Sequence, residues 1–132
     1  MLNSNFRVKL IYVLPLLALC LSANAYHQVS IINLIANPEK YLGMDVETKG
    51  FLQYNGELLL YVDQVRAKNV DFPSAVLVQD KSTENRLVEQ CGNKYVAVQG
   101  KVGERSRQLI IMDIINIFPL SEHKSCWEKQ KE

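Results

Sequence analysis

The chain has 132 residues, of which 15 are Lys or Arg and 14 are Asp or Glu, so its formal net charge is +1. A nearly neutral chain lacks the broad positive field that drives binding to a phosphate backbone, which disfavours a nucleic-acid partner. Its length is sufficient for one compact domain and no more.

The start of the chain has the pattern of a secretory signal peptide. Arg7 and Lys9 precede an apolar run over residues 10–21, which leads into Ser-Ala-Asn-Ala. A basic start, an apolar segment too short to cross a bilayer and an Ala-x-Ala motif predict export, with cleavage after Ala25. We therefore expect residues 1–25 to be removed and the product to be periplasmic or secreted.

Two other interpretations of this segment stay open. One is a buried N-terminal helix, which Pro15 disfavours because it interrupts the apolar run. The other is lipid attachment at Cys20, which would anchor the protein to a membrane; the bulky Leu19 before it disfavours this. We expect residues 26–132 to form a single domain with a charged C-terminal tail.

The first predicted element of this domain is a short helix over residues 29–36. Its apolar residues have helical spacing, and it should end before Pro38, because the residue preceding a proline avoids the α region. A second helical turn over residues 38–41 can begin at that proline and end at Gly43.

A β-hairpin is predicted next. Residues 45–54 alternate between apolar and polar, with Gly50 on the apolar face, as in a half-buried strand. Asn55-Gly56 predicts a type I′ turn. The returning strand, residues 57–63, is apolar on both faces, so either something covers its outer face or that face binds a ligand.

The remaining elements are predicted from the same kinds of pattern. In chain order they are a helical turn around Val65, a strand at 75–79, a helix at 83–90, strands at 95–102 and 109–118, and a tail at 121–132 that is partly helical around Trp127.

This order predicts a mainly β fold: a five-stranded barrel like the oligonucleotide/oligosaccharide-binding (OB) fold. Five short strands with a helix between the third and fourth are the elements of that barrel, here with an additional N-terminal helix. Gly50 and Gly100 lie mid-strand, where a glycine permits the sharp bend that closure requires.

Cys91 and Cys126 are the two cysteines of the predicted mature domain. In a small exported domain an even number of cysteines indicates a disulfide. If the fourth and fifth strands form a hairpin, the start of the fourth lies beside the end of the fifth, which brings the two cysteines together. Two free thiols are the alternative if the protein is not exported.

Two stretches resemble a family of small uncharacterised exported bacterial proteins. The first is LIANPEKY at residues 34–41, with Gly43, Val46, Gly50, Phe51 and Leu52 after it. The second is YVAVQGKV at residues 95–102, similar to the family's second V-x-G strand. The layout also loosely resembles bacterial OB-fold proteins linked to envelope stress tolerance. These resemblances imply a fold and a compartment, and no activity.

The sequence offers little for catalysis or metal binding. His27 lies at the predicted mature terminus and His123 in the tail, so neither is positioned as the base that a nucleophile needs. His123, Cys126 and Cys91 could supply three metal ligands, but a closed zinc site takes four, and export favours the disulfide. A phosphate-binding loop is absent. We expect no enzyme activity, no cofactor and no metal.

The candidate binding residues are aromatic and basic. Ligands of OB folds commonly lie across the second and third strands, between the loops that join strands one to two and four to five. The residues predicted to face this surface are Phe51, Tyr54, Tyr61, Lys101, Arg105 and Arg107. The alternative is that the N-terminal helix covers Tyr61 and that the arginines are only solvated.

The sequence therefore predicts an exported, non-enzymatic module that binds another protein. An envelope protein or a toxin to be neutralised would fit, in an inhibitor, immunity or stress-related role. The alternative is a binder of a small ligand, either an oligosaccharide or an anionic metabolite. The pattern identifies neither the partner nor the oligomeric state.

Overall fold

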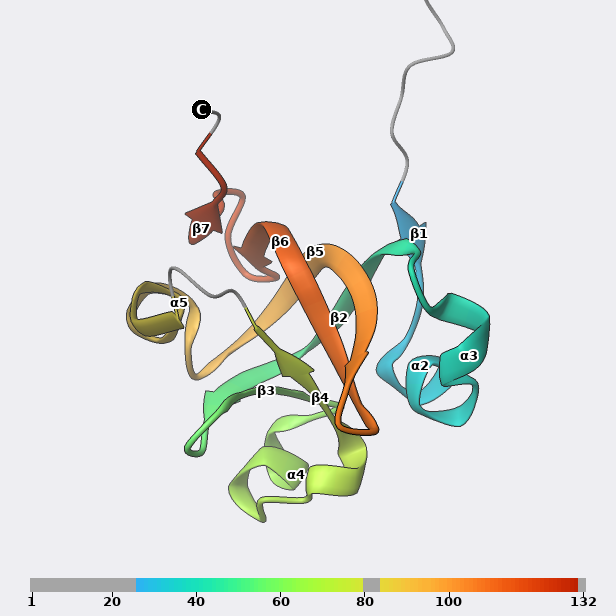
Figure 1. Ribbon diagram of the computed structural model, residues 1–132. Coiled ribbons are helices and arrows are strands. Elements are labelled where there is room, and N and C mark those ends of the chain that lie inside the picture. Colours follow the sequence, from blue (N-terminus) through green and yellow to red (C-terminus); the bar gives the residue numbers. More distant parts are fainter. Residues whose placement is uncertain (1–25, 80–83, 131–132) are drawn as a thin grey trace, which may run out of the picture.

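The computed structural model describes residues 26–79 and 84–130, so the predicted signal segment, Cys20 and residue 83 lie outside the described residues. The described chain is mainly β (Figure 1). Its elements are β1 (His27–Gln28), α2 (Ile31–Ala36), α3 (Pro38–Tyr41), β2 (Asp45–Tyr54), β3 (Leu58–Tyr61), α4 (Gln64–Lys68), the 3₁₀ turn η1 (Phe72–Ser74), β4 (Ala75–Val78), α5 (Glu84–Cys91), β5 (Lys94–Arg105), β6 (Gln108–Pro119) and β7 (Trp127–Glu128). Within these residues, no helix has the length and hydropathy needed to span a membrane.

Five strands form a closed ring. They pair in the order β2-β3-β4-β6-β5, and β5 pairs back onto β2. Each of these pairs is antiparallel except β4 with β6, which is parallel. Two short strands extend the sheet, β1 beside β2 and β7 beside β6. The predicted mainly β fold is confirmed, and so is the predicted pairing of the last two long strands, β5 and β6, as a hairpin.

The two mid-strand glycines lie where the chain packs too closely for a side chain. A Cβ on Gly50 would collide with the backbone oxygen of Tyr61 and would lie 2.5 Å from Cδ1 of Ile31. A Cβ on Gly100 would lie 2.8 Å from the backbone oxygen of Met112. Both positions therefore require the absence of a side chain, which fits their role in bending the strands.

The main core fills the ring and is closed by helices. One face of each strand points inward, α2 contributes the buried Ile31, and α5 contributes the buried Leu87 and Cys91. The buried strand residues of this core are Leu52, Leu58, Leu60, Val76, Val78, Val96, Val98, Ile111, Ile114 and Ile117.

The prediction of a type I′ turn at Asn55-Gly56 is wrong. Tyr54 pairs with Leu58, which leaves a three-residue loop, and of Asn55 and Gly56 only Gly56 has positive φ, at 74°. The two-residue turn lies instead at Ser106 and Arg107, where φ is 50° and 65°. Residues other than glycine rarely adopt positive φ, so the turn at Ser106 and Arg107 is strained.

The C-terminal tail differs from the prediction in one respect. Residues around Trp127 form the short strand β7 rather than a helix, because their backbone pairs with β6. The predicted disulfide is confirmed: Cys91, at the end of α5, is bonded to Cys126, with their Cα atoms 5.5 Å apart. The bridge fixes the tail against α5.

Candidate functional site

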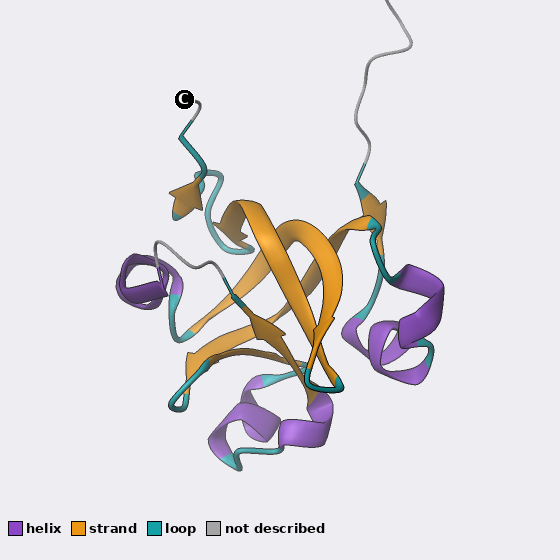
Figure 2. Cartoon of the chain, viewed as in Figure 1, coloured by secondary structure: helices purple, strands orange, loops and turns teal. Residues whose placement is uncertain are grey.

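Helix α4 covers the surface where a ligand of an OB fold would be expected. Leu59 and Tyr61 on the outer face of β3 are 1% and 0% exposed, and they pack in one cluster with Ala67 of α4. Figure 2 shows α4 lying across the end of the strands. The outer face of β3 is thus a second core, covered by α4 and not by the N-terminal helix.

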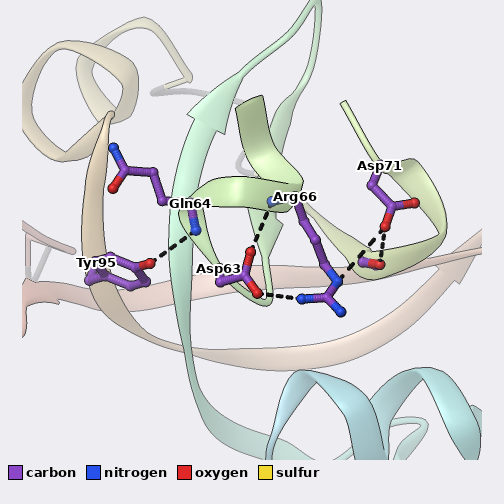
Figure 3. Close-up of polar contacts among 6 residues, drawn as sticks. Asp63, Gln64, Arg66, Asp71 and Tyr95 are labelled. Atoms are coloured by element: carbon purple, nitrogen blue, oxygen red, sulfur yellow. Dashed lines mark hydrogen bonds and ion pairs between the residues drawn. The ribbon is translucent and has the colours of Figure 1, made fainter. Parts of the chain in front are cut away.

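A polar network holds one side of α4 in place (Figure 3). The Asp63 carboxylate caps the helix by accepting the Arg66 backbone N–H at 2.9 Å, and it pairs with the Arg66 guanidinium. Arg66 Nε also lies 3.9 Å from Asp71, which accepts a hydrogen bond from the Ser74 hydroxyl at 2.6 Å. The hydrogen bond from the Arg66 backbone N–H lowers the pKa of Asp63 below its ordinary value.

The other side of α4 is held by an aromatic pair. The Tyr95 hydroxyl accepts a hydrogen bond from the Gln64 backbone N–H at 3.0 Å (Figure 3). The Tyr95 ring meets the Phe51 ring edge to face, with centroids 5.1 Å apart. The short helix is therefore attached on both sides, which explains how five residues can form a stable cover.

Phe51 and Tyr61 were expected to be accessible to a ligand, but α4 buries both of them. Phe51 is 6% exposed, and the buried Tyr61 hydroxyl accepts a hydrogen bond from the Asn55 side chain at 2.9 Å. Both side chains lie under α4, which the sequence indicated only as a turn around Val65. Tyr54 is 50% exposed and remains accessible.

The three basic residues are not gathered at one site. The Arg105 guanidinium donates to the carboxylate of Glu57 at 3.0 Å and to the side-chain oxygen of Gln79 at 2.8 Å, so it joins strand ends. Lys101 is half-buried on β5, opposite Asp45 on β2. Arg107 is exposed at the strained turn, where it borders a surface hollow.

A different surface collects exposed apolar side chains, and it is built on α2. This helix is apolar on both sides: Ile31 and Leu34 point into the domain, whereas Ile32 and Ile35 are 62% and 36% exposed. A helix that is apolar all round is normally covered on all sides. Within the described residues, α2 is not.

Two adjoining hollows extend this surface across neighbouring elements. One, of about 340 Å³, lies between Ile35, Leu42 and Phe72. The second, of about 280 Å³, contains Ile32 and shares Ile35 and Pro73 with the first. Figure 1 shows α2, α3 and the tip of the β5–β6 hairpin close together here. We call the surface formed by Ile32, Ile35, Leu42 and Phe72 the apolar face.

Charged side chains surround the apolar face. Glu39, Glu104 and Arg107 border the larger hollow. In the part of the chain that the structure describes, no ion pair joins any of these three to another residue. The arrangement, an apolar centre with a charged rim, is typical of a protein–protein interface.

The sequence contained a sign of this surface, since residues 31–36 read Ile-Ile-Asn-Leu-Ile-Ala, which is apolar on more than one side of a helix. Helical periodicity alone assigned these residues to the core.

Groups suited to catalysis are not assembled among the described residues. His27 lies beside Tyr41, with ring centroids 6.1 Å apart, and His123 borders a separate hollow near the C-terminal segment. No cluster of three or more His, Cys, Asp or Glu side chains within residues 26–79 and 84–130 has a metal-binding arrangement.

Comparison with known proteins does not assign this chain to a family. No protein-family model matches this chain, and no curated protein matches it.

Proposed function

We propose that this protein is a non-enzymatic binding module that docks a segment of another protein on the apolar face. The single observation that carries the proposal is the uncovered side of α2, where two isoleucines remain exposed next to Phe72, itself 54% exposed. Burying such side chains against a partner is favourable by roughly 25 cal/mol per Å² of apolar surface.

The size of the apolar face favours a peptide-like segment over a second copy of this chain. The exposed parts of its four side chains amount to roughly 400 Å², which is within the range of functional patches on small proteins. An obligate dimer buries on the order of 1,000 Å² or more on each subunit. The occupant is therefore a short segment with two or three adjacent apolar side chains.

The rim of the apolar face defines the charges of that segment. An acidic residue of the partner pairs with Arg107, and a basic residue pairs with the nearby Glu39 or Glu104. Complementary charges at a rim mainly improve the association rate and the specificity. We propose a mixed-charge segment with an apolar centre.

The fold and the compartment belong to the same proposal. The strand order and the parallel pairing of β4 with β6 support an OB-fold barrel, in which α4 covers the usual ligand surface. The signal-like residues 1–25 and the Cys91–Cys126 disulfide support an exported protein in an oxidising compartment. A role in the bacterial envelope, as an inhibitor, immunity or stress-related protein, is consistent with both.

Charge reversal at the rim tests the proposed site. Arg107→Glu should weaken capture of the partner from native envelope extract at least several-fold, whereas Arg86→Glu, at an exposed position on α5, should leave it unchanged. A captured protein counts in favour only if the double variant Ile32→Ser, Ile35→Ser loses it. Equal capture by all variants, or recovery of a second copy of this chain instead, would contradict the proposal.

A further inference from the structure

Another hollow lies on the opposite side of α4 from the Arg66 network. It has a volume of about 590 Å³. It is lined by Phe51 and Gln53 of β2, by Gln64, Val65 and Lys68 of α4, and by Asn93 in the turn just before β5. It shares no lining residue with either hollow of the apolar face.

The lining combines hydrogen-bond donors with a single sign of charge. Lys68 supplies an ammonium group, and Gln64 and Asn93 supply amide groups, while none of the lining residues is acidic. Among the described residues, Lys68 has no ion pair. The amide nitrogen of Gln53 is already used, because it donates to Asn55 at 3.3 Å and to the Ala67 carbonyl at 3.4 Å.

The geometry of α4 places two of its polar side chains together. Gln64 and Lys68 are four residues apart, so they lie on one side of the helix, one turn from each other. The Asp63 cap and the hydrogen bond to Tyr95 fix the first turn of α4 relative to β5 (Figure 3). The backbone that carries Gln64 is therefore fixed, whereas the exposed Lys68 side chain becomes ordered when it binds.

The hollow also has an apolar wall. Val65, which is 67% exposed, and the largely buried Phe51 both line it. Small-molecule sites typically combine an apolar surface with a few polar groups that fix the orientation of the ligand.

From these observations we infer that the hollow between α4 and β2 binds a small organic anion that has an apolar portion, such as an aromatic carboxylate. The carboxylate meets Lys68 and the amides of Gln64 and Asn93, and the ring lies along Val65 and Phe51. This site is independent of the docking of a protein segment on the apolar face.

The test is a titration of ¹⁵N-labelled protein with benzoate and, separately, with benzamidine, which has the same ring and the opposite charge. Benzoate at millimolar concentrations should shift the side-chain amide signals of Gln64 and Asn93 and the backbone signal of Val65. Benzamidine should not. Lys68→Gln should weaken benzoate binding at least five-fold, whereas Lys124→Gln, at an exposed position of the tail, should not change it.

Three outcomes would overturn the inference. They are the absence of shifts at these residues up to 50 mM benzoate, equal shifts with benzamidine, and unchanged benzoate binding in Lys68→Gln. Shifts at the hollow with the neutral trisaccharide maltotriose but not with benzoate would also contradict it, since they would indicate a sugar site. Because none of these residues belongs to the apolar face, failure here leaves the proposed docking segment untouched.

Discussion

The outer face of β3 and the outer side of α2 are both apolar, but only the first is covered. On β3, Leu59 and Tyr61 are almost fully buried under α4, which is held by the Asp63 cap and the Tyr95 hydroxyl. On α2, Ile32 and Ile35 are exposed. The same kind of side chain thus has two environments: under α4 it stabilises the fold, and on α2 it is exposed, where we propose that a partner binds.

The largest expected difference is in the free energy of unfolding. Leu59→Ala should lower it by about 3–4 kcal/mol, because it removes a buried side chain and leaves a cavity. Ile32→Ala, at a position that is 62% exposed, should change it by less than about 0.5 kcal/mol. Chemical denaturation of both variants measures this. Equal losses would mean that the outer side of α2 belongs to the core.

Removing the disulfide separates stability from binding. Cys91 and Cys126 are 35 residues apart, so replacing both by Ser should cost about 4 kcal/mol through the greater freedom of the unfolded chain. The bridge lies outside both apolar surfaces, so partner capture below the lowered melting temperature should persist. Thermal unfolding with and without reductant measures the first effect. Unchanged stability after reduction would contradict the assigned role of the bridge.

A smaller gain in stability is expected inside the ring. The Thr48 hydroxyl is buried and has no hydrogen-bond partner among the residues that the structure describes. Thr48→Val keeps the shape and removes this unsatisfied group, so it should raise the free energy of unfolding by about 1 kcal/mol. Thr48→Ser retains the hydroxyl and loses a methyl group, so it should be destabilising. If Thr48→Val is the less stable of the two, the hydroxyl has a partner.

The smallest effect concerns the cap of α4 and depends on pH. The pKa of Asp63 is lower in the folded protein than its ordinary value of 3.8, so its contribution to stability is present above that value. It should be lost as the pH falls through the lower pKa of the folded state. Asp63→Asn keeps a capping oxygen without the charge. The difference in melting temperature between wild type and Asp63→Asn should therefore shrink as the pH falls from 6 to 2, and a constant difference would contradict this assignment.

Local patterns in the sequence were sufficient to predict the strands and the disulfide. The alternation in residues 45–54 predicted β2 with its observed bounds, and the topology predicted the pairing of Cys91 with Cys126. The site residues were harder, because burial of Tyr61 depends on how α4 folds back over β3. The packing of α4 on β3 depends on contacts of Asp63, Gln64 and Tyr95, some of them between residues far apart in the sequence. The spacing of apolar residues within one segment does not predict such contacts.

The turns also show that local sequence patterns do not predict every feature of the fold. Asn55-Gly56 is a strong local signal, yet the two-residue turn forms at Ser106 and Arg107, which have no preference for positive φ. Pairing along the long strands β5 and β6 imposes that turn. Tertiary structure thus overrides the local preference at the position where Arg107 borders the apolar face.

Site-specific photo-crosslinking tests the central claim most directly. A photoreactive residue is placed at Ile35, which is 36% exposed in the apolar face, or at Ile115, which is 40% exposed on β6 and lies outside it. After irradiation of native cells, Ile35 alone should give one discrete adduct, and peptide mapping should locate the adduct in an apolar segment of another protein flanked by residues of both charges. Adducts of equal yield from both positions, an adduct to a second copy of this chain, or the absence of an adduct at Ile35 would contradict the account.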